Sequence, residues 1–553
     1  MRLSSTSIVL LCAGGIACAG SRQLSPTSAT VAAITTTDLQ HRLEIIADDS
    51  MMGRESGSEG DFKTAEYVAA EFRRLGLEPA GENGTYFQTV PFWTTAADPG
   101  SQLQVSGTML KFGRDFLPGS PVAAPRQLAD AEVVYGGALG SDALIGGDQA
   151  ADRIVVLTPR DNSLRGLRLD PARFGRAKAV AIVMLDNLPP EMVARLRDGR
   201  PVADTSTNPG AMPILWISRS AATTLLGAAT ETMTQGTTGR RANGSFGFVH
   251  TPVRFPARNV VAILRGSDPV LRGEYISLTA HNDHVGFDHA PVDHDSLRAF
   301  NRVIRPMGAD SPLREPTSAE WTRIHAILDS LRRVHKPRLD SIRNGADDDG
   351  TGTVSILEIA EAMSLGARPR RSILFVSHTG EEAGLLGSRW FTDHPTVPLD
   401  SVVAEIDEDM IGRALPTDFP HDGTGAGSPT YLEVVGAKRL SRQFGEALDS
   451  ANAHQPVPFV FNLEYDQPGH PLQYYCRADH YSYARYGIPS LALSRGEHLD
   501  YHQVTDEAQY IDYPDMLRVS KLVYDTAMLL ANAPSRPALD VPKPADPHGQ
   551  CRQ

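Results

Sequence analysis

Four strongly apolar runs in the second half of the chain each lead into residues that bind metals or protons. YISLTA leads to His281, SILFVS to Glu381 and Glu382, SVVAEI to the triplet Asp407-Glu408-Asp409, and PSLALS is soon followed by His498 and His502. Helical patterns separate these runs, and strands that alternate with helices indicate a mainly parallel sheet. Such sheets bind ligands outside the carboxyl ends of their strands, so we expect the polar residues to converge on one crevice.

The rest of the chain divides around this sheet. Residues 118–250 hold short strand-like runs between Gly, Pro and Asp turns, without a dense polar cluster, and predict a separate non-catalytic αβ module. We therefore predict an α/β fold in which residues 36–117 and 251–535 form a mainly parallel, or mixed, sheet flanked by helices. Within it, the stretch 288–343 is a helical insertion. Its segment SAEWTRIHAILDSLRRVHK predicts a helix of its own, which we expect to border the substrate cleft. Residues 536–553 are Pro-rich and are expected to be disordered.

Residues 1–19 have the layout of a secretory signal, with one arginine, a short apolar stretch and small residues around Cys18. The apolar stretch is too short for a membrane span. The tripeptide ACA fits a cleavage site, whereas GIAC resembles a bacterial lipobox in which Cys18 is lipidated, and both readings stay open. Residues 20–35, rich in Ser, Thr and Ala, predict a flexible tether. We expect an exported protein that is periplasmic, anchored to the outer membrane through Cys18, or secreted.

Charge and cysteine content restrict the function further. The formal net charge of −13 argues against nucleic acid as a partner, because binding to phosphates needs a basic surface. Two of the four cysteines lie in the signal, which leaves Cys476 and Cys551. These two could pair in an oxidising compartment, but the sequence does not decide it. The absence of C-x-x-C argues against thiolate zinc or a redox motif. The oligomeric state has no sequence signal.

The motif TAHNDHVG follows the first of the four runs. A histidine directly after a buried strand, such as His281, is a candidate metal ligand, and Asp283 could hydrogen-bond its other ring nitrogen and hold its tautomer. The alternative is a polar loop in which His281 and His284 occur by chance. Downstream, His289 and His294 are typical of loop residues rather than ligands.

The motif ADDDGTG has a competing interpretation. An EF-hand calcium loop would begin at Asp347, with its conserved positions filled by Asp349, Thr351, Gly352 and Glu358. The context argues against calcium, because Pro337 interrupts the incoming helix and Asn344-Gly345 breaks the chain before the aspartates. No second loop of this kind is present to pair with it.

Taken singly, each motif has an ordinary structural explanation, and the pair Glu381-Glu382 favours a solvated turn. Taken together, they supply two histidines and three carboxylates, namely His281, His502, Asp348, Glu382 and Asp409. Five ligands serve two zinc ions only if one is shared; if Asp348 bridges, each ion has three protein ligands and an open position for water. Glu381 is then free to act as a base. Hydrolases use such pairs of ions about 3.5–4 Å apart.

The series AHNDHVG, GADDDGTG, GEEAGLLGS, DEDMIG, RADHYSYARYGIP and DYHQVTDEAQYID, in this order, resembles the dizinc peptidases. This family includes bacterial and secreted aminopeptidases, glutamate carboxypeptidase and the transferrin receptor. The module at 118–250 resembles the protease-associated domain that some members insert. The chain departs from the family where Asp407-Glu408-Asp409 replaces the usual N-x-D, and where the stretch between His284 and Asp348 is longer than in compact relatives.

The resemblance implies a role for each matching residue. One zinc ion falls on His281 and Asp409, the other on Glu382 and His502, and Asp348 bridges the two. Glu381 matches the general base and Asp283 the partner of His281, while Tyr501 matches a tyrosine that helps to stabilise the oxyanion in some relatives.

The implied protein is a secreted zinc aminopeptidase that binds two zinc ions per chain and acts on peptides. Two alternatives remain. One is a carboxypeptidase or dipeptidase on the same metal core, which needs positioned Arg or Lys side chains for a free carboxylate. The other is a non-catalytic metal-binding protein, as the transferrin receptor resembles the family without its chemistry.

Overall fold

The computed structural model describes residues 31–553 except 121–123, 142, 160–168, 204–211, 420–424, 550 and 552. The predicted signal at 1–19, with Cys18, and most of the predicted tether lie outside the described residues. Within the described part, no helix is both long and apolar enough to cross a membrane.

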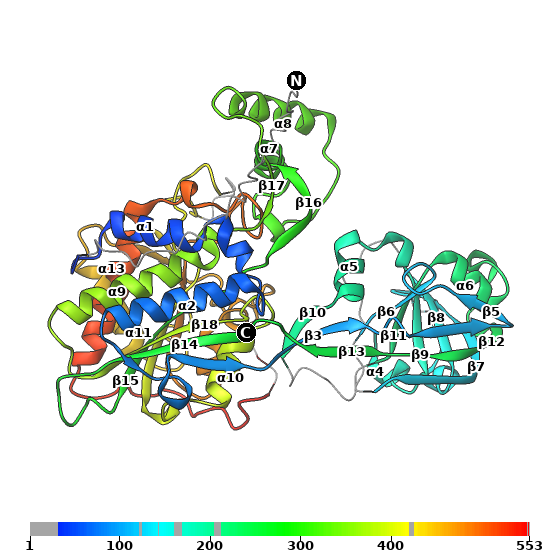
Figure 1. Cartoon of the computed structure of the whole chain (residues 1–553), viewed down its shortest axis with the longest axis horizontal. Helices are drawn as coiled ribbons and strands as arrows, with labels where there is room; N and C mark the ends of the chain where they lie inside the picture. The colour runs from blue at the N-terminus through cyan, green and yellow to red at the C-terminus, as the bar shows by residue number, and fades with distance from the viewer. Residues whose placement is uncertain are drawn as a thin grey trace, which may run out of the picture. The chain divides into compact units, whose positions relative to one another are not determined.

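A nine-stranded mixed sheet forms the main core (Figure 1). Its order is β1 (Glu78–Pro79), β14 (Ala257–Leu264), β18 (Ser372–His378), β15 (Tyr275–His281), β19 (Val402–Glu408), β22 (Ser490–Ser494), β20 (Tyr431–Val435) and β21 (Val460–Asn462), with β2 (Phe87–Val90) beside β14. The four central strands, β18, β15, β19 and β22, run parallel. Their residues are buried on both faces, which explains the continuous apolar runs in place of alternation. The prediction of a mainly parallel or mixed sheet flanked by helices is confirmed.

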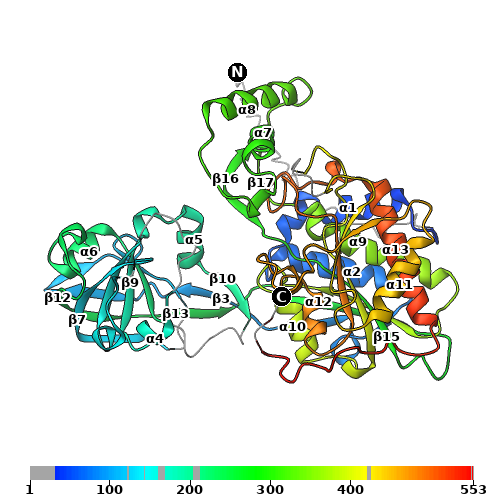
Figure 2. The ribbon, with the colours of Figure 1, turned by 180° about the vertical axis from the view of Figure 1, so that it is seen from behind.

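Helices cover both faces of this sheet because successive strand residues point to opposite sides. On one face, Ile373 and Phe375 of β18 pack in a cluster with α1 (Thr36–Ile46), α2 (Glu59–Arg74), α9 (Gly352–Leu365), α11 (Arg442–Ala453) and α13 (Tyr513–Asn532). On the other face, Leu374 and Val376 pack against α10 (Leu386–Asp393) and α12 (His480–Ala484), which Figure 2 shows from behind. Helix α9 is the central one, and its residues from Gly352 to Met363 are all buried.

A second sheet of eight strands has its own core. Its order is β5 (Thr108–Leu110), β4 (Gln102–Val105), β12 (Thr238–Phe246), β7 (Arg126–Ala138), β8 (Ile154–Thr158), β9 (Ala179–Val183), β11 (Ile214–Ile217) and β6 (Phe116–Pro118). The expected boundary at residue 118 is too late, because β4 pairs with β12 and buries Leu103 and Val105 in this core. The short helices α3 (Gly147–Ala150), α4 (Pro171–Phe174), α5 (Pro190–Asp198) and α6 (Arg219–Leu226) accompany it.

A three-stranded sheet of β10 (Arg200–Ala203), β3 (Phe92–Ala97) and β13 (Phe248–Pro252) joins the segments that enter and leave this module. The identity of the module at 118–250 as a protease-associated domain stays a prediction.

The stretch between His284 and Asp348 forms a small unit of its own. Strands β16 (Phe287–Asp293) and β17 (Leu339–Ile342) pair antiparallel, and the chain between them forms α7 (His294–Ile304) and α8 (Ser318–Leu331). Helix α8 begins with a capping box in which Thr317 and Glu320 satisfy each other's backbone N–H groups. Buried Ala299, Ile304 and Ile324 join the two helices.

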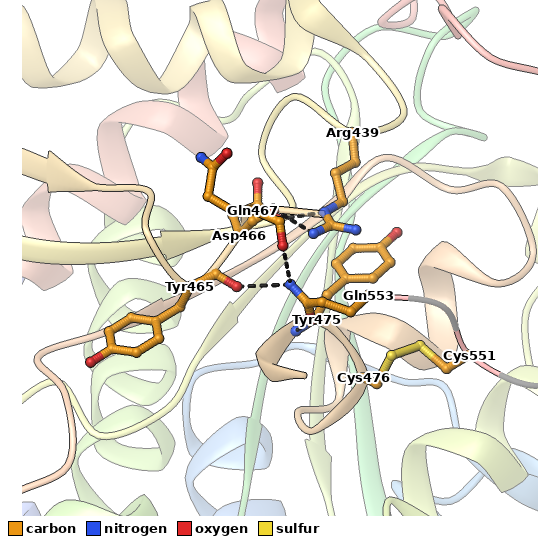
Figure 3. Close-up of a disulfide and its surroundings, with 8 residues drawn as sticks. All are labelled: Arg439, Tyr465, Asp466, Gln467, Tyr475, Cys476, Cys551 and Gln553. Carbon is orange, nitrogen blue, oxygen red and sulfur yellow. Dashed lines mark hydrogen bonds and ion pairs between the residues drawn. A yellow bond between two sulfur atoms is a disulfide. The ribbon is translucent and has the colours of Figure 1, made fainter. Parts of the chain in front are cut away.

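The Pro-rich tail is attached to the main domain near its end, which corrects the expectation of disorder. Cys551 forms a disulfide with Cys476 (Figure 3). The side chain of Gln553 donates hydrogen bonds to the carbonyls of Tyr465 at 2.8 Å and Gln467 at 3.1 Å, and it accepts one from the Tyr475 N–H at 2.9 Å.

Candidate metal centre and active site

The ends of the central strands bring the predicted site residues together. Strand β15 ends at His281, Glu381 and Glu382 lie in the turn after β18, and Asp409 follows β19. The loop after β22 carries His502, whose φ of 55° lies in the left-handed region. Non-glycine residues in that region concentrate at functional sites. The convergence expected from parallel strands is therefore observed.

Two groups of candidate ligands share Asp348. In the first, His281 Nε2 lies 3.3 Å from Asp348 Oδ1 and 3.8 Å from Asp409 Oδ1. In the second, His502 Nε2 lies 3.0 Å from Asp348 Oδ2 and 2.9 Å from Glu382 Oε2. One oxygen of Asp348 thus faces each group, which is the arrangement that a bridging carboxylate requires.

The chemistry of these atoms fits metal ions. His281 Nε2, Asp348 Oδ2, Glu382 Oε1 and Asp409 Oδ1 are buried, and within the described residues they form no hydrogen bond of acceptable geometry, although they lie close to one another and to the ring nitrogens of His284 and His502. Buried polar atoms are normally paired, since an unpaired one is costly. Mixed imidazole and carboxylate donors suit zinc. The charges around His502 also favour a cation. Burial would lower the pKa of His502, but the nearby carboxylates of Glu382 and Asp348 raise it to about 10.

The three consecutive aspartates at the start of α9 have separate tasks. Asp349 accepts hydrogen bonds from the backbone N–H groups of His281 at 3.1 Å and Met410 at 3.2 Å, and so joins β15 to the end of β19. Asp347 accepts from the N–H of Gly412 at 2.7 Å. Only Asp348 turns towards both ligand groups, and the Asp348–Asp349 peptide bond is cis.

This arrangement also decides against the EF-hand interpretation. Glu358, which would close a calcium loop, is buried and forms an ion pair with Arg42 on α1. It lies on a face of α9 that packs against α1 and α2, away from the aspartates.

Sequence reasoning did not assign a role to two residues that the structure places at the site. His284 is buried, and its Nδ1 lies 2.8 Å from Glu382 Oε1, so it joins the second group. Gly345 makes room for it, because a Cβ there would lie 2.5 Å from His284 Cγ. Buried Arg54, far away in the sequence, donates hydrogen bonds to the carbonyls of Asn282 at 3.0 Å and Gly345 at 2.9 Å, and so holds the loop before Asp348. The only signal for His284 was its place in TAHNDHVG, and Arg54 had none.

Asp283 differs from the expectation. Its carboxylate lies 3.6 Å from His281 Nδ1, whereas its backbone oxygen lies nearer, at 3.2 Å. The carboxylate instead accepts hydrogen bonds from Ser56 Oγ at 2.6 Å and from the Glu381 N–H at 3.1 Å. Asp283 therefore positions Glu381 as well as His281.

The two adjacent glutamates have different surroundings. Burial raises the pKa of Glu381 well above its usual value, and the neighbouring Glu382 and Asp409 raise it further. Burial would also raise the pKa of Glu382, but His502 and His284 beside it bring that pKa down to about 2. Glu381 Oε2 lies 4.0 Å from His281 Nε2 and outside both groups. The Glu382 carboxylate thus suits a metal ligand, and the Glu381 carboxyl group suits proton transfer.

Three further polar residues singled out in the sequence lie near the candidate ligands. Tyr501 stacks on His502 with ring centroids 4.0 Å apart, and burial raises the pKa of its hydroxyl well above 10, which keeps it a hydrogen-bond donor. Glu408 faces away and accepts a hydrogen bond from Ser355 on α9 at 2.7 Å. His498 lies outside both groups, with Nε2 3.2 Å from Asp347 Oδ2.

A pocket opens beside the two groups. Asp348, Glu381, Asp409, Tyr501 and His502 line it on the side of the ligand groups. Apolar side chains of β20, β22 and the segment after β19 form much of the remaining wall, and Glu433, Glu497 and Arg477 complete it. A substrate bound here would lie directly against Glu381.

The second part of the chain matches known proteins. Residues 259–527 match Peptidase family M28. Leucine aminopeptidase 1 of Paracoccidioides brasiliensis (strain Pb18) is 31% identical over 198 residues, which cover 33% of this chain and 46% of that protein. Leucine aminopeptidase 1 of Penicillium rubens is 30% identical over 199 residues, with 34% and 48% covered. The chain spans about half the length of the curated relatives it matches.

Among solved structures, the zinc aminopeptidase BSAP from Bacillus subtilis aligns with 90% of this chain and 95% of its own, at 16% identity and a TM-score of 0.49. The aminopeptidase from Aneurinibacillus sp. strain AM-1 aligns with 92% and 96%, also at 16% identity and a TM-score of 0.49. The matched segment 259–527 contains both ligand groups, Glu381 and Tyr501. Through this segment, the chain is similar to peptidase family M28.

Proposed function

We propose that the chain is a zinc-dependent aminopeptidase that releases N-terminal residues from peptides. The observation that carries the proposal is the sharing of Asp348 by two ligand groups, with Glu381 beside them in a pocket but outside both. The family and the leucine aminopeptidases of similar sequence support zinc-dependent hydrolysis of peptides.

We assign His281, Asp348 and Asp409 to one zinc ion, and Asp348, Glu382 and His502 to a second, with His284 beside Glu382. Bound zinc would polarise the scissile carbonyl and lower the pKa of a water molecule. Glu381 is placed to accept a proton from a water molecule that attacks the scissile carbonyl carbon, and to deliver this proton to the amine nitrogen when the peptide C–N bond breaks. The Tyr501 hydroxyl donates to the carbonyl oxygen as its negative charge develops. Asp283 holds Glu381 in place through the Glu381 N–H.

The charge of the pocket favours an aminopeptidase over a carboxypeptidase. Five carboxylates line the pocket, those of Asp348, Glu381, Asp409, Glu433 and Glu497. The single arginine, Arg477, already pairs with Asp310 at 3.0 Å. Such a pocket attracts an N-terminal ammonium group and repels a C-terminal carboxylate.

A panel of chromogenic substrates tests the proposal. The zinc-loaded protein is expected to cleave aminoacyl p-nitroanilides and to leave their N-acetylated forms intact, and a chelator is expected to abolish cleavage. Equal cleavage of free and blocked substrates would contradict the exopeptidase assignment. Release of C-terminal residues from N-blocked peptides would favour the carboxypeptidase alternative.

We also propose that the protein works outside the cytosol, after export through the signal at 1–19. The disulfide between Cys476 and Cys551 supports this, because such bonds persist in oxidising compartments. Mass spectrometry of the mature N-terminus would separate lipidation at Cys18 from simple cleavage. Recovery of the intact, unprocessed chain from the cytosol would contradict export.

A further inference from the structure

Two acidic groups in the pocket are neither candidate metal ligands nor donors or acceptors in the proton transfers described above. Glu433 lies on β20, which pairs with β22 next to the site, and it is only 2% exposed. Glu497 follows β22, and its side chain is 9% exposed. Burying a carboxylate is costly unless it is paired, so two of them in one pocket call for a cation.

The partners of these two groups within the chain are incomplete. Glu433 Oε2 accepts a hydrogen bond from the Tyr431 hydroxyl at the long distance of 3.4 Å, and no arginine, lysine or histidine of the described residues forms an ion pair with it. Glu497 accepts a hydrogen bond from the Tyr474 hydroxyl and lies 3.7 Å from Arg477 Nη1. Arg477 is closer to Asp310, at 3.0 Å, so its single charge serves two carboxylates. The pocket therefore holds more acidic groups than cationic side chains to pair with them.

Much of the rest of the pocket wall is apolar. This apolar part is formed by Met410, Val435, Ala492, Leu493 and the ring of Tyr474. Apolar walls with buried carboxylates match one kind of side chain, a hydrocarbon stem that ends in a cation. Lysine and arginine are the amino acids with this shape.

We propose that this pocket receives the side chain of the substrate's N-terminal residue and selects lysine and arginine, with Glu433 as the main ion-pair partner and Glu497 as the second. The inference rests on the aminopeptidase function proposed above. It names the substrate class of that site, because the pocket borders Glu381 and both ligand groups. Burial and the neighbouring Glu497 raise the pKa of Glu433 well above its usual value, as expected for a carboxyl group that awaits its counter-ion.

Lysyl and norleucyl p-nitroanilide separate the contribution of the side-chain charge, because norleucine keeps an unbranched stem and the α-ammonium group but lacks the terminal charge. The wild-type protein is expected to show a kcat/KM for the lysyl substrate at least about tenfold above that for the norleucyl substrate, the range of a charged hydrogen bond. Glu433→Gln is expected to remove most of this ratio, and Glu497→Gln a smaller part. Glu446→Gln, on the exposed face of α11, is the matched control and should leave the ratio unchanged. The inhibition constants of free L-lysine and L-norleucine measure the contribution of the side-chain charge to binding alone.

Each outcome decides a separate point. A wild-type ratio near one, with norleucyl substrate cleaved, would overturn the inference and leave the aminopeptidase function standing. An equal loss on both substrates in Glu433→Gln would also overturn it, because Glu433 would then act on the α-ammonium group or on folding. If the zinc-loaded protein cleaves no free-amine substrate, the proposed function itself fails.

Discussion

At the scale of single residues, the pair after β18 shows how neighbours acquire different chemistry. The Glu382 carboxylate lies beside the rings of His284 and His502. Glu381 lines the pocket instead, and its Oε2 lies 4.0 Å from His281 Nε2. Because adjacent side chains leave a turn in different directions, two identical residues meet different fields. A ligand and a base are thus obtained from one dipeptide.

Glu381→Gln is expected to lower kcat by about 10²–10⁴-fold, because the amide cannot accept the proton of the attacking water. Its zinc content should stay that of the wild type, since Glu381 lies outside both ligand groups. Elemental analysis beside steady-state kinetics measures both. Near-wild-type turnover in a zinc-loaded variant would remove Glu381 from the mechanism.

A buried histidine at the end of β18 links stability to pH. Burial lowers the pKa of His378 to about 3, from 6.5 in the unfolded chain. As the pH falls below 6.5, the unfolded state takes up a proton that the folded state refuses, so stability is lost between pH 6.5 and 3. His378→Gln should therefore reduce the slope of unfolding free energy against pH in this window, by up to about 1.4 kcal/mol per pH unit. Urea unfolding at several pH values measures it, and an unchanged slope would contradict the assignment.

At the scale of elements, the insertion between β15 and α9 supports the loop that carries Tyr501 and His502. The N–H of Ala309 donates to the Tyr501 carbonyl at 3.0 Å, and Asn301 on α7 donates to the carbonyl of Leu499 at 2.9 Å. Arg298 on α7 pairs with Asp500 at 3.0 Å. These contacts place the insertion against that loop, whereas its position beside the substrate cleft and its effect on substrate choice stay predictions.

Gly308→Ala tests this support. Gly308 has a φ of +50°, and a Cβ there would lie 2.4 Å from the Tyr501 carbonyl oxygen, so the loop must move. Activity is expected to fall by about tenfold to hundredfold, since displacements of about 1 Å have such effects. Gly84→Ala is the control, because Gly84 has a φ of +74° with open space around it. Equal activity in the two variants would show that the contact does not position Tyr501.

At the scale of the whole molecule, a disulfide joins the C-terminal tail to the main domain. The disulfide connects Cys476, next to the pocket residue Arg477, with the Pro-rich tail, across a sequence separation of 75 residues. Closing a loop of that size restricts the unfolded chain. The tail is thereby held against the main domain, where Gln553 also binds the chain around Tyr465 (Figure 3).

Cys551→Ser is expected to lower the free energy of unfolding by about 2–4 kcal/mol under oxidising conditions. Cys476→Ser should have a similar effect, and the double variant should lose no more than either alone, since one bond is removed in each case. Denaturant unfolding with and without a reductant measures the differences. Additive losses would show that the cysteines act separately.

The metal content is a property of the assembled site. The wild-type chain is expected to bind two zinc ions, and Asp348→Asn should reduce both, because each ligand group includes Asp348. Chelation should lower the melting temperature, since it leaves buried carboxylates without their counter-ions. One zinc ion per wild-type chain by elemental analysis would contradict the bridging role.

Much of this could be predicted from the sequence, because it depends on local order. A strand buried on both faces must be continuously apolar, and the residue after it must lie at the edge of the sheet. The runs before His281, Glu381 and Asp409 therefore indicated the sheet, its ligand-bearing edge and the groups that meet there. The order of the motifs indicated the family in the same way.

Other features were decided only by the tertiary structure, because they are contacts between segments that are distant in the chain. Arg54 reaches the loop before Asp348, β4 completes a sheet with β12, and Cys476 meets Cys551. Glu433 lies in a strand whose sequence, YLEVV, gives no sign of a pocket. Its place beside Glu497 depends on the antiparallel pairing of β20 with β22. Periodicity along the chain reports which residues are buried, but only the packing of the elements determines which of them face each other.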